Sequence, residues 1–265
     1  MVNKIHKNLG NTKGILSDID GTLFFKGSAI PGAIEAISKI RKMGIKFLFL
    51  TNTDSKTPKS IYTQLVRYGF SIKENEIFTP IIALKEFIST EPEKSIYLVA
   101  SKEIESLFSE FNLIKNNQIP DYVIIADFRD NWDLNRLNLA FKYIMQGAKL
   151  FGAQGNRYFL DQKGEPVIDT GSLVKMLAVT ANVSFKIFGK PSIEFFNQAL
   201  NKLSLRSNEC IVIGDDYESD IQGAHNTNMK SILVKTGKGS YYKPSNKEKK
   251  PTLIIESFKS ILEYL

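Results

Sequence analysis

Ten residues near the start of the chain, 15–24, constrain what it can fold into more than any other stretch. A short apolar run leads into Asp18 and Asp20, and a Gly-Thr turn follows. This pattern is typical of a buried strand that ends at a sheet edge. Residues two apart on a strand point to the same side, so the two carboxylates can converge on one site. The alternative is a solvated turn in which Asp is favoured for its local hydrogen bonds.

The rest of the chain alternates predicted strands and helices at the spacing of parallel βαβ units. The alternation is regular near both ends, with apolar strand runs at 45–50, 185–188 and 210–213. In the middle, residues 149–169 are typical of short strands joined by a hairpin. We therefore predict an α/β fold with a Rossmann-like parallel-sheet core and an inserted α/β cap domain. The predicted core comprises residues 1–79 and 184–265, and the predicted cap comprises residues 80–183.

Four polar side chains follow apolar strand runs directly or within two residues: Asp18, Thr51, Lys190 and Asp215. Ligands of open α/β sheets bind at the carboxyl ends of the strands. We therefore expect the four side chains to share one site. Such a site would contain a candidate nucleophile, a hydroxyl donor, a fixed cation and a further carboxylate.

Phosphoryl transfer needs this set of groups. An Asp carboxylate can attack phosphorus and form an aspartyl-phosphate, which divides one difficult displacement into two easier steps. Because a carboxylate repels a phosphate dianion, the site needs positive charge. Mg²⁺ bound by the carboxylates would supply part of it, and Lys190 would supply more. Thr51 and backbone amides near Asn52 can hydrogen-bond the transferring oxygens. Asp20 can protonate the leaving oxygen and then take a proton from water.

The stretch 215–220 adds carboxylates where a predicted strand gives way to a helix. Asp216 and Asp220 are therefore candidates for supporting a metal site. For Asp220 the alternative is a purely structural role, because acidic residues suit the first turn of a helix.

Four motifs, in their order and spacing, resemble those of haloacid dehalogenase superfamily phosphatases. They are Asp18-Ile19-Asp20-Gly21-Thr22-Leu23, Thr51-Asn52-Thr53, Gly189-Lys190-Pro191 and Gly214-Asp215-Asp216 with Asp220. The insertion between the second and third motifs is similar to the α/β cap of subgroup IIA, the 4-nitrophenylphosphatase-like branch. Where relatives commonly have Ala-Gly-Met after the fourth motif, this chain has Thr227-Asn228-Met229. Asn tolerates the left-handed conformation, so we expect a helix cap to survive there.

The resemblance implies a Mg²⁺-dependent phosphatase with a Rossmann-like core. It implies that Asp18 is the nucleophile, Asp20 the acid/base and Lys190 the partner of the phosphate charge. It also implies that Mg²⁺ is held by Asp18, the Asp20 backbone carbonyl and Asp215. The residues expected to contact the substrate's phosphate are Thr51, Asn52, Thr53 and Lys190.

The loop Phe128-Arg129-Asp130-Asn131-Trp132 resembles the substrate-specificity loop of subgroup IIA relatives in its position. Trp132 offers a large apolar face, and Arg129 could pair with a second anionic group of the substrate. The alternative is that Trp132 packs against the helix expected to begin near Leu134. Relatives with this cap often pair through it, so the resemblance also implies a homodimer through the cap.

Composition limits the partners. The chain has 35 Lys and Arg against 28 Asp and Glu, a net charge of +7, but no long tract alternates basic and aromatic residues. We therefore expect a small phosphorylated substrate and no nucleic acid. No apolar run approaches the ~18 residues of a membrane span. Cys210 is the only cysteine, which favours a reducing, cytoplasmic location.

Three alternatives to a phosphatase of small metabolites stay open at this point. A phosphotransferase or mutase would use the same aspartyl-phosphate but exclude water, and a phosphoamide or pyrophosphate hydrolase would differ only in its substrate. A non-enzymatic signalling or binding domain would use phosphorylation of Asp18 as a switch. That domain would need neither Asp20 nor a large cap, so the inserted segment argues against it.

Overall fold

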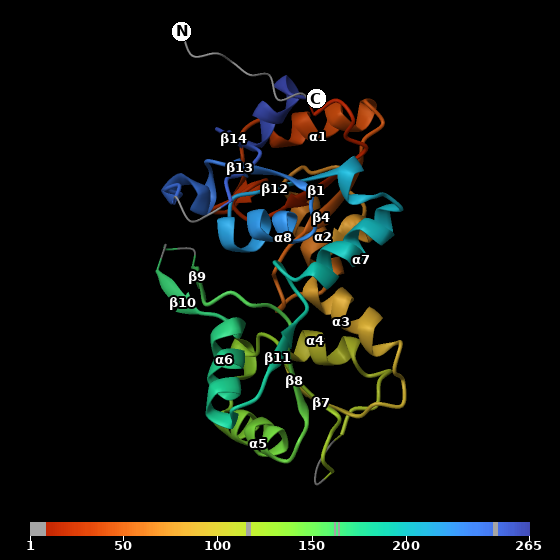
Figure 1. Cartoon of the computed structure of the whole chain (residues 1–265), viewed down its shortest axis with the longest axis vertical. Helices are drawn as coiled ribbons and strands as arrows, with labels where there is room; N and C mark the ends of the chain where they lie inside the picture. Colours follow the sequence, from red (N-terminus) through yellow and green to blue (C-terminus); the bar gives the residue numbers. More distant parts are fainter. Residues whose placement is uncertain (1–8, 115–117, 162, 164, 246–248) are drawn as a thin grey trace. The chain divides into compact units, whose positions relative to one another are not determined.

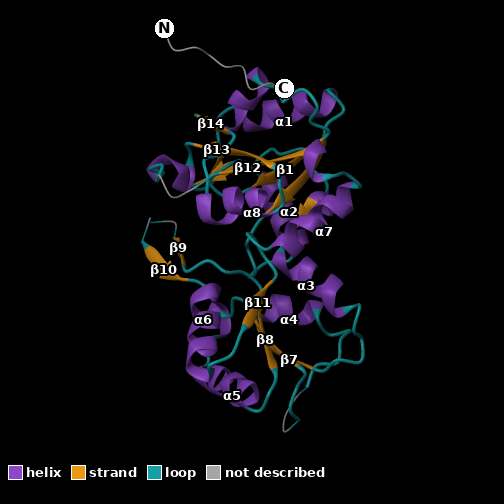
Figure 2. Cartoon of the chain, in the orientation of Figure 1, coloured by secondary structure: helices purple, strands orange, loops and turns teal. Residues whose placement is uncertain are grey.

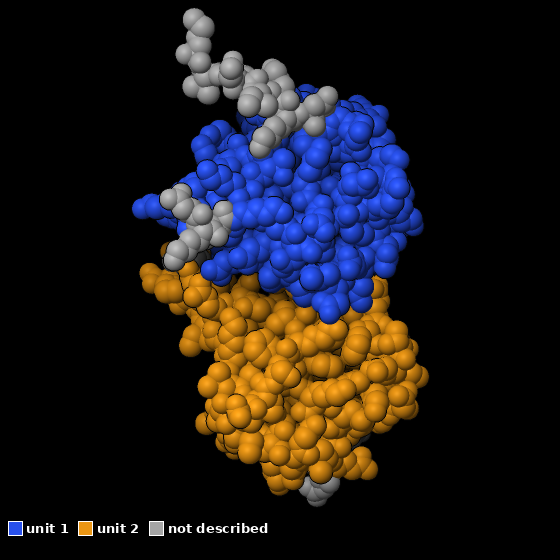
Figure 3. Space-filling view, viewed as in Figure 1, with its two compact units in different colours: residues 1–51, 62–78, 191–265 blue, residues 52–61, 79–190 orange. Residues whose placement is uncertain are grey.

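The computed structural model describes residues 9–114, 118–161, 163, 165–245 and 249–265. The chain forms two compact units, which Figure 3 shows in separate colours. The first unit consists of the chain up to Thr51 together with residues 62–78 and 191–265, and the second of residues 52–61 and 79–190. Among the described residues, no helix has the length and apolar character that crossing a membrane requires.

A six-stranded parallel sheet forms the centre of the first unit, in the order β14-β13-β12-β1-β4-β5. All residues of the neighbouring strands β1 and β12 are buried. Strands buried on both faces are continuous apolar runs, and this is why the sequence reveals them. The strands are β1 (Gly14–Asp18), β4 (Lys46–Leu50), β5 (Ile77–Phe78), β12 (Cys210–Gly214), β13 (Lys230–Val234) and β14 (Leu253–Ile255).

Helices cover both faces of this sheet. Figure 1 shows α1 (Ala33–Lys42) on one face and α7 (Ile193–Leu203) and α8 (Gln222–Asn226) on the other. The chain also forms α2 (Pro58–Arg67) after β4, and a short hairpin of β2 (Phe24–Phe25) and β3 (Ser28–Ala29) after β1. Beyond α8, Asn228 has a φ of 57°, so the left-handed conformation expected there is confirmed.

The second unit has its own parallel sheet of four strands, in the order β11-β8-β7-β6. Side chains of α5 and α6, among them Leu137, Tyr143 and Val174, share one core with strand residues such as Val123. The strands are β6 (Ile96–Val99), β7 (Tyr122–Ile125), β8 (Lys149–Gly152) and β11 (Phe185–Ile187), and β9 (Tyr158–Leu160) pairs with β10 (Pro166–Ile168) in the predicted hairpin. Its helices are α3 (Pro80–Ile88), α4 (Lys102–Leu107), α5 (Leu134–Met145) and α6 (Thr170–Ala181), drawn in purple in Figure 2.

The predicted α/β class, with parallel sheets and flanking helices, is confirmed. One strand was assigned to the wrong sheet, however. β11 pairs with β8 in the second unit and not with the strands of the first. An apolar run has the same local pattern whichever sheet receives it, so its long-range partner could not be read from the sequence. The domain boundaries stay a prediction, and the compact units differ from them at residues 52–61 and 184–190.

A buried carboxyl joins three segments of the second unit. Asp54 Oδ2 accepts hydrogen bonds from the Asp127 N–H at 3.1 Å and the Thr170 hydroxyl at 2.8 Å. Asp54 is 3% exposed and Asp169 is also buried. Burial raises the pKa of Asp54 well above its ordinary value, and the nearby charge of Asp169 raises it further. The folded state therefore favours the protonated form of Asp54.

We expect Ser204→Gly to stabilise the protein. Ser204 ends α7 with a φ of 53°, a left-handed conformation that strains a residue with a Cβ atom. Part of the gain is lost because Gly also has more freedom in the unfolded chain, so the net effect should be about 0.5–1 kcal/mol. Differential scanning fluorimetry would measure it as a rise in Tm. Asn182→Gly, at the equivalent place after α6, is the matched comparison and should gain less, because Asn tolerates this conformation.

We expect Asp54→Asn to change how stability depends on pH. The folded state holds the Asp54 proton to a higher pH than the unfolded chain does. The free energy of unfolding of the wild type should therefore fall as pH rises from about 4 through the pKa of the folded state. Asn keeps an acceptor oxygen but carries no charge. The Tm of the variant minus that of the wild type should therefore increase as pH rises.

Melting curves between about pH 4.5 and 8 would measure this difference, at about 2–4 °C for each 1 kcal/mol. Asp130→Asn, at an exposed position, is the control and should shift Tm equally at every pH. A Tm difference for Asp54→Asn that does not vary with pH would contradict the raised pKa.

Candidate active site

Two carboxylates lie side by side at the carboxyl edge of the first sheet. Asp18 is the last residue of β1, and Asp215 directly follows β12. The two strands are hydrogen-bonded in parallel, with Ser17 opposite Ile213, so their ends are fixed next to each other. Both carboxylates are buried. The Thr22 hydroxyl donates to Asp18 Oδ2 at 2.9 Å, which holds that side chain in place.

A third carboxylate completes the group. After Asp216 the chain makes a π-helical turn over Tyr217–Ile221, and this turn brings Asp220 back toward the strand end. A Cβ atom on Gly214 would lie 2.1 Å from Asp220 Oδ2, so a glycine is needed there. One oxygen from each of Asp18, Asp215 and Asp220 lies within 4.8 Å of the others, the one such metal-ligand group in the part of the chain that the structure describes.

This group fits a divalent metal ion. Burial raises the pKa of Asp215 well above its ordinary value, and the charges of Asp18 and Asp220 raise it further. Three buried carboxylates this close repel one another, and a cation among them removes the repulsion. Carboxylate oxygens are the ligands that Mg²⁺ and Ca²⁺ prefer, so the donor set suits a hard cation.

Two other predicted residues have different surroundings. The Asp216 side chain caps the π-helical turn by accepting from the Glu218 N–H at 3.0 Å, and Lys238 Nζ donates to it at 2.5 Å. Its carboxylate is therefore engaged outside the group of three. Asp20 follows β1 by two residues and its side chain is exposed, as an acid that exchanges protons with a substrate or water would need to be.

Thr51 and the residues after it divide between the two units. Thr51 follows β4, is 2% exposed, and donates its N–H to the Phe78 carbonyl at 3.3 Å in the first unit. Thr53 is partly buried in the second unit. Thr51 thus stands at the same edge of the sheet as Asp18.

In the second unit, the Asn52 side chain holds the backbone of Lys190. Asn52 Oδ1 accepts from the Lys190 N–H at 2.8 Å, and its Nδ2 donates to the Lys190 carbonyl at 3.1 Å. The same Nδ2 donates to Asn156 Oδ1 at 3.1 Å. Gly189 makes this approach possible, because a Cβ atom there would lie 2.6 Å from Asn52 Oδ1. Two predicted residues, Asn52 and Lys190, are therefore brought together, and Asn52 fixes the position of the lysine.

The predicted specificity loop is anchored at its base. Arg129 donates through its backbone N–H and its guanidinium to the Asp127 carboxylate, and it lies over the Phe159 ring at 4.2 Å. Trp132 stacks on the buried Phe128 with ring centroids 4.8 Å apart, yet it remains 54% exposed. One face of Trp132 is therefore packed, while about half of the residue is open to solvent. Of the two remaining loop residues, Asp130 is exposed and Asn131 is partly buried.

Sequence reasoning assigned no role to several residues that shape these sites. The Lys238 N–H donates to Asp215 Oδ2 at 2.6 Å, and the Thr236 hydroxyl donates to the Gly21 carbonyl at 2.5 Å. The sequence does contain a signal, because Thr-Gly-Lys-Gly begins two residues after the end of an apolar strand run. For Asn156, in a turn-rich stretch of the second unit, no pattern in the sequence points to Asn52.

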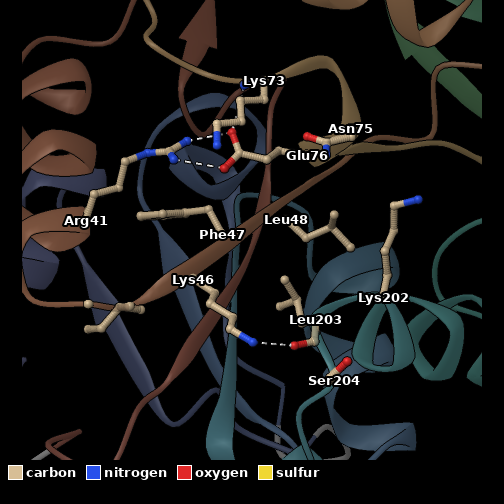
Figure 4. Close-up of a pocket in the computed structure, with 12 residues that line it drawn as sticks. Arg41, Lys46, Phe47, Leu48, Lys73, Asn75, Glu76, Lys202, Leu203 and Ser204 are labelled. Carbon is tan, nitrogen blue, oxygen red and sulfur yellow. Dashed lines mark hydrogen bonds and ion pairs between the residues drawn. The ribbon is translucent and has the colours of Figure 1, made fainter.

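A cleft of about 490 Å³ lies at the opposite, amino end of β4 (Figure 4). Two of its basic groups, Arg41 and Lys46, already have structural partners. Arg41 forms two hydrogen bonds with Glu76, at 2.8 and 2.7 Å, and Lys46 Nζ donates to the Leu203 carbonyl at the end of α7. Lys46 thus stabilises the carboxyl end of α7, and Arg41 is held in an ion pair with Glu76. The cleft therefore does not have the features of a catalytic site.

Sequence comparison identifies the family. The profile described as haloacid dehalogenase-like hydrolase matches residues 15–114, and a second, HAD-hydrolase-like profile matches residues 187–261. The chain is 32% identical to mouse haloacid dehalogenase-like hydrolase domain-containing protein 2 over 96% of this chain and 95% of that protein. It is 30% identical to human phospholysine phosphohistidine inorganic pyrophosphate phosphatase, over 91% and 88% of the two chains.

Solved structures agree with this assignment. A p-nitrophenyl phosphatase from Archaeoglobus fulgidus matches the fold with a TM-score of 0.85 at 22% identity, over 96% of this chain and 99% of that one. A putative p-nitrophenyl phosphatase from Bacillus subtilis matches with a TM-score of 0.81 at 26% identity, over 96% of each chain. The chain therefore belongs to the haloacid dehalogenase-like hydrolase superfamily and is a phosphatase of its subgroup IIA.

Proposed function

We propose that this phosphatase hydrolyses small phosphorylated metabolites through an aspartyl-phosphate on Asp18, with Mg²⁺ as its cofactor. The observation that carries the proposal is the buried group of Asp18, Asp215 and Asp220 at the carboxyl ends of β1 and β12. A nucleophilic carboxylate next to two further carboxylates suits a reaction that needs both covalent attack and a bound cation.

In the first step, an oxygen of Asp18 attacks phosphorus and the bond from phosphorus to the ester oxygen breaks. Asp20 gives its proton to that oxygen, which leaves as an alcohol. In the second step, Asp20 takes a proton from water, and the resulting hydroxide attacks phosphorus. The acyl phosphate bond breaks, inorganic phosphate leaves, and both Asp side chains return to their first states.

The charges of this reaction need compensation. Asp18, the Asp20 carbonyl and Asp215 would hold Mg²⁺, with Asp216 and Asp220 in support, and the bound ion would act as a Lewis acid on the phosphate. Lys190 would neutralise part of the phosphate charge, and its backbone is held for this by Asn52. Thr51 and the backbone amides of Asn52 and Thr53 would donate hydrogen bonds to the phosphate oxygens.

A second candidate activity is hydrolysis of a phosphoamide or of pyrophosphate. The relative that favours it is the phospholysine phosphohistidine inorganic pyrophosphate phosphatase, at 30% identity over most of both chains. The same two steps apply, because only the leaving group changes. Release of inorganic phosphate would distinguish either hydrolysis from a phosphotransferase, which would pass the group to another acceptor.

The second unit would serve as the cap, and a second copy of the chain would pair through it. Val179 on α6 is 81% exposed, and Val183 and the edge-strand residue Phe185 are also exposed. In the described part of the chain β11 is an edge strand of its sheet, and exposed apolar residues beside such an edge support the proposed pairing. The single cysteine, a buried free thiol, supports a reducing location such as the cytoplasm.

Asp18→Asn should abolish turnover and leave the fold intact. An amide cannot serve as the phosphorylated nucleophile, so we expect kcat to fall about 10³-fold or more. The variant also removes one of three buried carboxyls that repel one another when charged, so its Tm without divalent ions should rise above that of the wild type. Phosphate release from p-nitrophenyl phosphate and melting curves with and without Mg²⁺ would measure both effects.

Glu35→Gln, an exposed carboxylate on α1, is the control and should change neither quantity. If folded Asp18→Asn retained activity within tenfold of the wild type, Asp18 would not be the nucleophile. If the wild type kept full activity in excess chelator after removal of bound metal, the proposed cofactor would be wrong.

Trp132→Ala and Arg129→Ala should change substrate preference. We expect the ratio of kcat/KM between natural phosphorylated substrates to change about tenfold, or ~1.4 kcal/mol, while hydrolysis of p-nitrophenyl phosphate changes much less. Met145→Ala, another exposed apolar residue of the second unit, is the control. Equal losses on all substrates in both loop variants, or no loss on any, would show that the loop does not set specificity.

A further inference from the structure

A segment outside the four motifs holds the Asp215 carboxylate. Residues 236–239 follow β13 and begin a 3₁₀ turn, Gly237–Tyr241. The Lys238 N–H donates to Asp215 Oδ2 at 2.6 Å. The Thr236 hydroxyl donates to the Gly21 carbonyl at 2.5 Å, which ties this segment to the turn after β1. One oxygen of Asp215 is therefore engaged by a backbone group that cannot rotate away.

Two glycines close on the same carboxylate. A Cβ atom on Gly21 would lie 2.1 Å from Asp215 Oδ2, and one on Gly237 would lie 2.0 Å from it. The same Cβ atom on Gly237 would also lie only 2.7 Å from the Gly21 Cα atom. Both glycines have positive φ, 87° and 51°. The Asp215 carboxylate is thus packed between two backbone segments that have no side chains there, and it has little room to rotate.

The side chain of Lys238 acts at a different carboxylate. Its Nζ donates to Asp216 Oδ2 at 2.5 Å, in an ion pair that ties residue 238 to the residue after Asp215. The side chain thus secures the segment, while the backbone N–H fixes Asp215. This division allows the two contributions to be separated by mutation.

We propose that residues 236–239 clamp Asp215 so that it offers one oxygen to a cation, and that this sets a preference for Mg²⁺ over Ca²⁺. Mg²⁺ takes single carboxylate oxygens at about 2.0–2.1 Å in a near-octahedral arrangement, whereas Ca²⁺ takes longer bonds and accepts both oxygens of a carboxylate. With Oδ2 held by the Lys238 N–H, Asp215 cannot turn to present both oxygens equally. The inference rests on the proposed function, because it needs a divalent ion at Asp18, Asp215 and Asp220.

Binding of MgCl₂ and of CaCl₂ to the metal-free full chain, each measured by isothermal titration calorimetry, tests the clamp. Gly237→Ala places a methyl group against Asp215 and so displaces its carboxylate from the Lys238 N–H. The released carboxylate can offer both oxygens to Ca²⁺, so the ratio of the Kd for Ca²⁺ to the Kd for Mg²⁺ should fall about tenfold. Gly44→Ala is the matched control, because Gly44 also has a positive φ, 79°, but a Cβ atom there meets nothing within 4 Å. That variant should keep the wild-type ratio.

Two further variants separate the backbone clamp from general effects. Lys238→Met keeps the N–H but removes the ammonium, so both Kd values should shift in the same direction and their ratio should stay within about threefold of wild type. Thr236→Val loosens the segment without a clash and should lower the ratio about threefold, which tests the clamp even if Gly237→Ala does not fold.

Each outcome decides between the two proposals. A wild type that binds Mg²⁺, with Gly237→Ala and Thr236→Val folded and unchanged in ratio, would overturn the clamp and leave the proposed function standing. A wild type that binds neither ion would overturn the proposed metal site, and the clamp with it. A ratio that falls equally in Gly44→Ala would assign the effect to backbone strain and overturn the clamp.

Discussion

The structure depends on one constraint: two carboxylates that repel each other must stay adjacent. Asp18 and Asp215 come from strands far apart in the sequence, and the β1–β12 pairing sets them next to each other. The buried residues of both strands fix this pairing, because a slip by one residue would move every side chain away from the neighbours that it packs against. The free energy of the core thus holds in place a charge arrangement that would otherwise separate.

Glycines give this arrangement its rigidity. Gly214 makes room for Asp220, while Gly21 and Gly237 pack against Asp215. At each place the backbone approaches a carboxylate more closely than any side chain would allow. Because the carboxylates have little freedom before a cation binds, little conformational entropy remains to be lost on binding. A site built in this way is preorganised by backbone and not by long flexible side chains.

The sequence predicted the parts of the site that local pattern controls. Asp18 and Asp215 stand at the ends of apolar runs, and parallel strands bring such ends to one edge of the sheet. The positions of the strands alone therefore predict that the two carboxylates lie together. Local pattern could not tell whether Asp216 or Asp220 would join Asp18 and Asp215, since that depends on a π-helical turn. It also gave no way to choose the sheet that β11 joins, because long-range pairing leaves no local trace.

The second unit shows how a loop can be both anchored and exposed. Arg129 is engaged by Asp127, so a substrate anion would have to compete with a carboxylate that is already in contact. Trp132, in contrast, rests one face on Phe128 and remains 54% exposed. A rigid aromatic face loses little entropy when it contacts a ligand, whereas freeing Arg129 would leave Asp127 buried without its partner. On physical grounds Trp132 is therefore better suited than Arg129 to contact a substrate, and Arg129 to keep the loop in position.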